Sequence, residues 1–97
     1  MYRVKISEEL EELIPKFLIN RKNEILQLKE FVEEKNIMEI KRMGHLIKGV
    51  SGSYGFDFLS ELAKKVEDYS EDIFLVKDCI KKMDEYLENI EIEYIED

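Results

Sequence analysis

The sequence predicts an all-α fold, an antiparallel up-down-up-down four-helix bundle with a short additional N-terminal helix. The 97 residues include one Pro and four Gly, while 44% are hydrophobic and 39% are charged, a composition typical of long amphipathic helices. Apolar residues recur at helical spacing, and no segment alternates apolar and polar residues over more than a few positions. The expected helices are joined by short loops, which favour antiparallel neighbours.

The first two helices are expected on either side of Pro15. Ser7 is a suitable N-cap, and the acidic residues that follow it suit the positive end of a helix dipole, so the sequence predicts a short helix over 7–14. Pro15 then falls in the first turn of the next helix, where its missing N–H is harmless. We expect this second helix to run to about residue 34, with an apolar stripe of Phe17, Leu18, Ile25, Leu28 and Val32.

The third helix is expected to begin at Asn36 and to end at Gly55. Glu39 follows Asn36 by three residues in a capping-box pattern, and glycine commonly ends a helix because it tolerates the left-handed conformation. The stripe of this helix is Ile37, Ile40, Met43, Ile47, Val50 and Tyr54.

The last two helices have start signals at Asp57 and at either Ser70 or Asp72. We expect the final helix to continue its apolar stripe through Tyr94, near the end of the chain. The inward residues of these two helices are Leu59, Leu62, Ala63, Val66 and Tyr69, followed by Ile73, Val76, Ile80, Met83, Leu87 and Ile90.

Two residues stand out on the apolar stripes. Arg21 interrupts the stripe of the second helix, and we expect its stem to pack while its guanidinium reaches an acid or the carbonyls that close the third helix. Cys79 is the one cysteine of the chain. It excludes an intrachain disulfide, and a small buried hydrophobic role is favoured over a reactive thiol.

Composition and charge narrow the class of protein. The length suits a single domain, 1–97, with one modest core. The net charge of −8 argues against nucleic acid as a partner, because phosphate contacts need clustered Lys and Arg. No apolar run approaches the length of a membrane span, and the N-terminus lacks an apolar signal segment. We therefore expect a cytoplasmic protein with no membrane partner.

His45 is the only histidine, and the helical wheel places it opposite the apolar stripe of the third helix. It is therefore expected to face solvent. Lys41, Arg42 and Lys48 lie about one turn away, and the outward positions that follow it are Gly49 and Gly52. A plain solvated face would explain the cations alone, whereas the combination with two outward glycines points to a site.

An exposed imidazole near its unperturbed pKa of about 6.5 is a competent nucleophile toward phosphorus at neutral pH. The ammonium of Lys48 can stabilise the negative charge that a phosphoryl group adds. Gly49 and Gly52 would let another protein approach closely. On this interpretation the two glycines give a partner protein access to His45.

The stretch GHLIKGVSGSYGFDFLSELAKKVED, residues 44–68, resembles the signature of histidine-containing phosphotransfer (HPt) domains. It is similar also to the phosphorylated domain of chemotaxis-type histidine kinases. Gly44 departs from that signature, since Ala is common before the histidine, and we expect this change to weaken the helix without altering the chemistry. The signature positions are His45, Lys48, Gly49, Ser51, Tyr54, Gly55, Leu59 and Leu62.

The resemblance implies a phosphorelay carrier in two-component signalling rather than an enzyme with its own ATP site. His45 would accept a phosphoryl group from a receiver-domain aspartate or a sensor histidine kinase and pass it to another receiver aspartate. Glu67 stands where some chemotaxis-type relatives carry a glutamate that orients the histidine, although it could equally be a surface acid. The resemblance implies no cofactor in this chain, and Mg²⁺ would be bound by the partner receiver.

Two other functions compete with the phosphorelay carrier. A binding-only bundle would keep the HPt shape and dock receiver domains without carrying phosphate. A metal site at His45 is disfavoured because zinc needs three or four ligands and no second histidine exists. We expect a monomer, with Lys41, Arg42, Gly49 and Gly52 forming the surface that docks response-regulator receiver domains.

Overall fold

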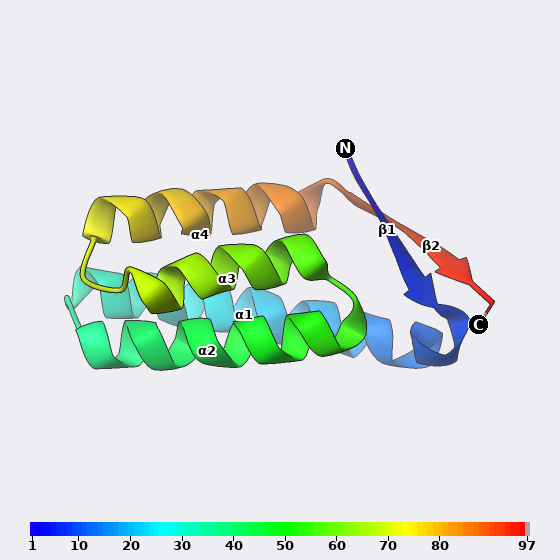
Figure 1. Cartoon of the computed structure of the whole chain (residues 1–97), viewed down its shortest axis with the longest axis horizontal. Helices are drawn as coiled ribbons and strands as arrows, with labels where there is room; N and C mark the ends of the chain where they lie inside the picture. Colours follow the sequence, from blue (N-terminus) through cyan, green and yellow to red (C-terminus); the bar gives the residue numbers. More distant parts are fainter. Residues whose placement is uncertain (97) are drawn as a thin grey trace.

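A computed structural model describes residues 1–96 and confirms the four-helix bundle. The helices α1 (Ile14–Glu33), α2 (Ile37–Tyr54), α3 (Asp57–Asp68) and α4 (Ile73–Glu88) lie side by side along the long axis (Figure 1). Contacts join α1 with α2, α2 with α3, α3 with α4 and α4 with α1. These four contacts are the sides of an up-down-up-down bundle.

Three predicted helix starts are confirmed. Pro15 lies in the first turn of α1. The Asn36 side chain accepts from the backbone N–H of Glu39 at 3.3 Å, so Asn36 caps α2. Of the two candidates for the start of α4, Asp72 is the cap, because its carboxylate accepts from the N–H of Leu75 at 3.1 Å. These ends depend on local hydrogen bonds, which is why the sequence predicts them.

The prediction that Asp57 caps α3 is wrong. The cap position is occupied by Phe56, which makes no side-chain capping bond, and Asp57 is the first helical residue. There its carboxylate still faces the positive end of the helix dipole. Phe56 is instead fully buried and stacks on Phe17, with ring centroids 4.6 Å apart. Burial of this ring fixes where the α2–α3 connection enters the core.

The N-terminal helix expected over 7–14 is also wrong in part. The chain begins with strand β1 (Tyr2–Ser7) and continues in a 3₁₀-helix, η1 (Glu8–Leu13). Ser7 does act as a cap, accepting from the N–H of Glu9 at 3.2 Å, but it caps the 3₁₀-helix. Polar and apolar side chains alternate over Tyr2–Ser7, but the segment is short. A strand of this length is stable only together with the strand it pairs with, so the segment alone does not predict it.

That partner is strand β2 (Ile90–Ile95), which replaces the expected continuation of the last helix through Tyr94. Helix α4 ends at Glu88, and the Asn89 side chain donates to the carbonyl of Glu85 at 2.8 Å. Ile90 and Tyr94 are four residues apart and fit a helical stripe. Ile90, Ile92 and Tyr94 together also fit the two-residue period of a strand. The side-chain pattern alone therefore does not distinguish a helix from a strand here.

The two strands pair in parallel, with Tyr2 opposite Ile90 and Ser7 opposite Ile95. Figure 1 shows why they are parallel: both run away from the bundle, and η1 then turns the chain back into α1. An even number of antiparallel helices brings both strands to the same end. The sheet therefore joins opposite ends of the chain, and the whole bundle forms its crossover connection.

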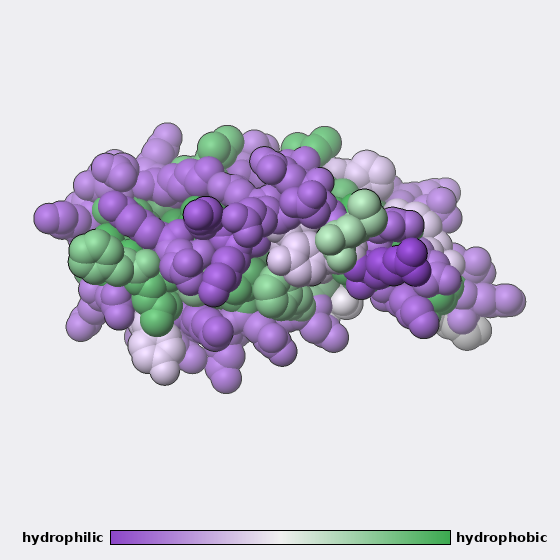
Figure 2. Space-filling view, turned by 90° about the horizontal axis from the view of Figure 1, so that it is seen from above, coloured by the Kyte–Doolittle hydropathy of each residue, from purple (hydrophilic) through white to green (hydrophobic). Residues whose placement is uncertain are grey.

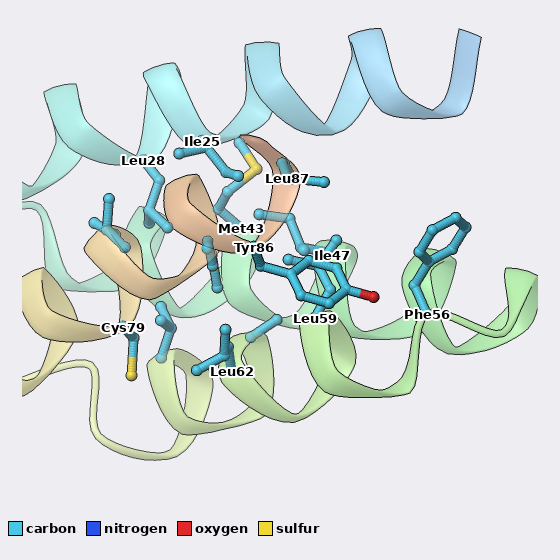
Figure 3. Close-up of a cluster of buried hydrophobic side chains, with 14 of the residues drawn as sticks. Ile25, Leu28, Met43, Ile47, Phe56, Leu59, Leu62, Cys79, Tyr86 and Leu87 are labelled. Atoms are coloured by element: carbon cyan, nitrogen blue, oxygen red, sulfur yellow. The ribbon is translucent and has the colours of Figure 1, made fainter. Parts of the chain in front are cut away.

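The core is one hydrophobic cluster that draws side chains from β1, from the α2–α3 connection and from every α-helix. Figure 3 shows part of it, with Ile25, Leu28, Met43, Ile47, Leu59 and Leu62 directed into the space between the helices. Cys79 belongs to this cluster, as predicted, and burial raises the pKa of its thiol. A raised thiol pKa keeps Cys79 in the neutral, unreactive form at neutral pH.

Arg21 is buried, with 5% of its surface exposed. Its guanidinium makes two hydrogen bonds to the carboxylate of Glu24, at 2.6 and 2.7 Å. The guanidinium carbon also lies 4.8 Å from the ring centroid of Phe17. The prediction of a packed stem and a head that reaches an acid is confirmed, and the acid belongs to the same helix.

The face of the molecule seen in Figure 2 is mostly hydrophilic, with hydrophobic side chains visible between polar ones along the bundle. Among residues 1–96, no helix combines the length and the apolar character needed to cross a membrane.

Candidate functional site

The candidate site lies where α2 and α3 run side by side. Gly55 ends α2 with a φ of 92°, a left-handed conformation that favours glycine. The N–H of Phe56 then donates to the carbonyl of Ser51 at 2.9 Å, which closes the turn. Helix α3 returns antiparallel to α2, so its C-terminal turns reach the level of His45.

A single carboxylate joins the two helices at this level. Glu67 Oε2 lies 2.7 Å from Nδ1 of His45, and Oε1 lies 2.7 Å from Nζ of Lys48. The hydrogen bond from Lys48 lowers the pKa of the Glu67 carboxyl most, and the bond with His45 lowers it further, against the opposing effect of burial. Glu67 is therefore ionised at neutral pH and accepts from both neighbours.

An ionised carboxylate can only accept hydrogen bonds, so this contact fixes the tautomer of the neutral histidine. Nδ1 carries the proton and donates it to Glu67. Nε2 is then left with its lone pair free. The His45 side chain is 69% exposed, as the wheel predicted, whereas Glu67 is 16% exposed. The arrangement is a nucleophilic nitrogen at the surface, held from behind by a largely buried acid.

Lys48 lies closer to α3 than the wheel suggested. Its side chain is 32% exposed and its ammonium is engaged by Glu67. The ammonium thus occupies the same small region as the histidine ring, because one carboxylate binds both. A positive charge fixed there favours a negatively charged group that approaches His45.

Gly44 brings the helices close enough for this contact. A Cβ atom at Gly44 would lie 2.8 Å from the backbone nitrogen of Glu67 and 3.0 Å from the carbonyl oxygen of Ala63. Both neighbours are backbone atoms, which cannot turn aside as a flexible side chain can. The expectation for Gly44 was a weaker helix, and the structure adds a role that was not predicted: Gly44 permits the close packing of α2 on α3.

A second contact ties the helices about one turn further along α2. The hydroxyl of Ser60 donates to the carbonyl of Lys48 at 2.8 Å. A Cβ atom at Gly52 would lie 3.3 Å from that hydroxyl oxygen, so Gly52 leaves room for Ser60. Gly52 is exposed on its outer side and also backs onto α3. It therefore contributes to helix packing as well as to the open surface.

The remaining predicted docking residues lie around the histidine on α2. Gly49 is exposed, and an added Cβ would meet no atom within 4 Å. Lys41 is exposed and borders a shallow depression formed by Glu67 and the α3–α4 turn. Arg42 is exposed but pairs with Glu39 one turn back in the same helix. Gly49 is thus the one glycine of the predicted pair with open space beside it.

Sequence reasoning missed the roles of Gly44 and Ser60. Gly44 falls at the flank of the apolar stripe, where a glycine can mark either access or close helix packing. The signal that favours packing is the row of small residues on the facing helix, Ser60 and Ala63. Residues 1–96 contain no group of three or more His, Cys, Asp or Glu side chains arranged to hold a metal ion.

We predict that Gly44→Ala destabilises the protein by about 1–3 kcal/mol, because the added methyl group forces α3 away from α2. This sign is opposite to the intrinsic preference of a helix, which favours alanine over glycine by up to about 1 kcal/mol. Gly49→Ala is the matched control and should be neutral or stabilising, since its surroundings are open. Urea unfolding measures both variants. Equal stability gains at the two positions would contradict the packing role of Gly44.

The lowered pKa of Glu67 also predicts a pH dependence. A carboxyl whose pKa is lower in the folded than in the unfolded protein stabilises the fold above its unfolded value, about 4.5. That contribution is lost as the pH falls through the folded value. Wild-type protein should therefore exceed Glu67→Gln in stability at pH 7, and the difference should shrink below about pH 4.5.

The measurement for Glu67 is the free energy of unfolding in urea between about pH 3 and pH 7. Glu61→Gln is the control, because it removes an exposed acid of the same helix without touching His45 or Lys48. Curves for wild-type and Glu67→Gln that stay parallel over this range would show that the carboxylate does not hold the two helices together.

One comparison with known proteins identifies the family of the chain. The model of the Hpt domain family matches residues 7–93, a segment that contains all four α-helices and every residue of the site. The comparisons with curated proteins and with solved structures gave no match. Hpt domains are phosphocarrier modules of histidine phosphotransfer in phosphorelay signalling. The match covers most of the chain, and the protein therefore belongs to the Hpt domain family.

Proposed function

We propose that this protein is a phosphorelay carrier that accepts a phosphoryl group on His45. The donor is a receiver-domain aspartyl phosphate or a sensor histidine kinase, and the acceptor is the aspartate of another receiver domain. The observation that carries the proposal is the exposed His45 ring whose Nδ1 is bound by Glu67, which directs the lone pair of Nε2 toward solvent.

In the transfer step, Nε2 attacks the phosphorus of the aspartyl phosphate. The new Nε2–P bond forms as the P–O bond to the receiver's aspartate breaks, and the aspartate leaves as a carboxylate. No proton has to move, because Nδ1 keeps its proton throughout. Passage to the next receiver is the same exchange in reverse, with a carboxylate attacking and Nε2 leaving.

Glu67 and Lys48 have different roles in this proposal. The imidazole ring becomes more positive as Nε2 bonds to phosphorus, and the Glu67 carboxylate at Nδ1 stabilises that charge. Lys48 lies within reach of the same carboxylate and stabilises the negative phosphoryl oxygens as a point charge. Because both side chains depend on Glu67, its loss should affect the transfer more than loss of an isolated surface charge.

The surface beside His45 is the proposed docking site for receiver domains. Gly49 leaves open space next to the ring, and Lys41, Arg42 and Gly52 surround it on α2. Small residues let the partner's aspartate come within bonding distance of Nε2. Mg²⁺ would be supplied by the receiver's own acidic pocket. We place the protein in the cytoplasm as a monomer, where receivers and kinase domains are accessible to it.

The experiment that tests this function is incubation with a phosphorylated receiver domain and Mg²⁺, followed by detection of the label on this chain. Wild-type protein should acquire an acid-labile, base-stable phosphoryl group. His45→Gln should acquire none, since the chain has one histidine. Lys22→Gln is a control that alters an exposed side chain of α1, outside both the Glu67 network and the proposed docking surface. It should retain labelling.

Two outcomes would overturn the proposal. Undiminished labelling of His45→Gln would place the phosphoryl group on another residue. Binding of receivers without labelling of wild-type protein would make this chain a binding-only bundle. Circular dichroism spectra of wild-type protein and of both variants check that a loss of labelling does not come from a loss of the fold.

A prediction for Gly49 separates docking from folding. Gly49→Gln should keep or raise the stability, by up to about 1 kcal/mol, because glycine is unfavourable in an exposed helix interior. Transfer from a receiver should fall sharply, since the new side chain occupies the docking surface. Labelling by phosphoramidate, which needs no such surface, should change much less if this small donor labels His45.

The matched control is Asn23→Gln, which places the same side chain at an exposed position of α1. It should leave transfer from the receiver unchanged. If Gly49→Gln loses stability and transfer together, Gly49 supports packing and does not mark a docking face.

A further inference from the structure

One edge of strand β1 has no partner strand. The N–H of Tyr2 donates to the carbonyl of Asn89 at 2.9 Å, so Tyr2 faces β2. In a parallel ladder alternate residues face the same neighbour, and the backbone groups of Arg3 and Lys5 therefore point to the opposite edge. Among residues 1–96, no backbone hydrogen bond from another element engages them. An unpaired edge of this kind is a template for a further strand.

A groove of about 530 Å³ runs along this edge. One wall is β1 itself, from Met1 to Lys5, and the other is formed by Gly55, Asp57, Phe58 and Tyr86. Figure 1 shows the edge of β1 facing the end of the bundle where α2 passes into α3. At its Lys5 end this edge is close to the α2–α3 turn, because a Cβ atom at Gly55 would lie 4.0 Å from the Lys5 carbonyl oxygen. The accessible part of the edge is therefore centred on Arg3, and an extended peptide segment could pair with it there.

Aromatic side chains line the groove. Tyr2 stacks on Phe58, with ring centroids 5.4 Å apart, and contacts Tyr86 at 5.1 Å. Tyr2 and Phe58 are 37% and 38% exposed, so part of each ring remains available. Figure 3 shows the hydroxyl of Tyr86 directed toward the end of the bundle where Phe56 lies. Burial raises the pKa of Tyr86 to about 12, so this hydroxyl is a hydrogen-bond donor at neutral pH.

Two cations of β1 and one acid of the opposite wall, Asp57, line this groove. Arg3 and Lys5 are exposed, and within residues 1–96 neither makes an ion pair. On the occupied edge of β1 the residues directly opposite them are Glu91 and Glu93 of β2. The protein as a whole carries a net charge of −8. A basic strand is therefore a local exception, and cross-strand pairs of opposite charge stabilise a sheet.

The pairing of β1 with β2 shows which side-chain pattern suits a strand beside β1. Strand β2 alternates apolar residues, which pack toward the bundle beside Val4 and Ile6, with acidic residues opposite the two cations. A strand on the other edge of β1 meets the same side chains in the same alternation. We propose that this groove binds an extended segment of a partner protein in which apolar and acidic residues alternate. The segment would add a third strand to the sheet.

This site is separate from the proposed phosphotransfer function. The family match begins at residue 7, so all of β1 before Ser7 lies outside it. A second copy of this chain could offer its own β2, but two copies of a protein with this net charge repel one another. Pairing of β1 in one copy with β2 in the next would also leave free edges at both ends and give an open-ended assembly. A partner segment is therefore the favoured occupant.

The probe is a blocked peptide with the sequence of residues 89–96, NIEIEYIE, added to isotope-labelled protein. Amide shifts should change at Arg3, Gly55 and Phe58, while those of Ile92 and Tyr94 should change little. The matched peptide NIKIKYIK reverses the two inner charges and replaces the terminal acid with lysine. It should bind about tenfold more weakly, because its lysines face Arg3 and Lys5.

Variants of Arg3 separate the backbone from the side chain. Arg3→Ala should weaken binding of the acidic peptide, whereas Arg3→Pro should abolish it by removing the outward N–H. Proline is tolerated on a strand edge that lacks a partner. A nuclear Overhauser effect between the Tyr2 amide and Ile90 checks that β1 still pairs with β2 in both variants. Labelling of His45 by a receiver should be unchanged.

Four results would overturn the inference. The first is no binding of NIEIEYIE, and the second is equal binding of the two peptides. The third is displacement of β2, seen as large shifts at Ile92 and Tyr94 with none at Gly55 and Phe58. The fourth is concentration-dependent self-association that Arg3→Pro abolishes, which would assign the edge to a second copy of the chain.

Discussion

The site depends on one carboxylate that is shared between two side chains of the neighbouring helix. Glu67 holds Nδ1 of His45 with one oxygen and the ammonium of Lys48 with the other. The contact sets the tautomer of the histidine, keeps its ring fixed at an otherwise exposed position and fixes a cation nearby. A surface histidine without this support would sample several rotamers and both neutral tautomers.

The shared carboxylate requires that α2 and α3 lie close together at the level of Gly44. Gly44 removes the methyl group that would strike the α3 backbone, and Ser60 ties the same two helices through the carbonyl of Lys48. The glycines around His45 therefore have distinct physical roles. Gly44 serves packing, Gly55 adopts the left-handed conformation that ends α2, and Gly49 leaves the outer surface bare. The prediction that glycines let a partner protein approach His45 therefore fits Gly49, and not Gly44 or Gly55.

The sequence predicted those features that depend on local interactions. The caps at Asn36 and Asp72 and the outward position of His45 follow from residue type and helical spacing alone. The pairing of β1 with β2 could not be predicted in that way, because it joins opposite ends of the chain and each strand is short. Glu67 was a candidate by resemblance, and its contact with His45 depends on the rotation and spacing of two separate helices.

The central claim is that Glu67 holds the proton on Nδ1 and leaves Nε2 as the nucleophile. Long-range hydrogen–nitrogen correlation NMR of the His45 ring, recorded before and after phosphorylation, tests it most directly. The account predicts a neutral ring protonated at Nδ1 and, after transfer, a phosphoryl group bonded to Nε2. A proton on Nε2 in the neutral ring, or phosphorylation at Nδ1, would contradict it.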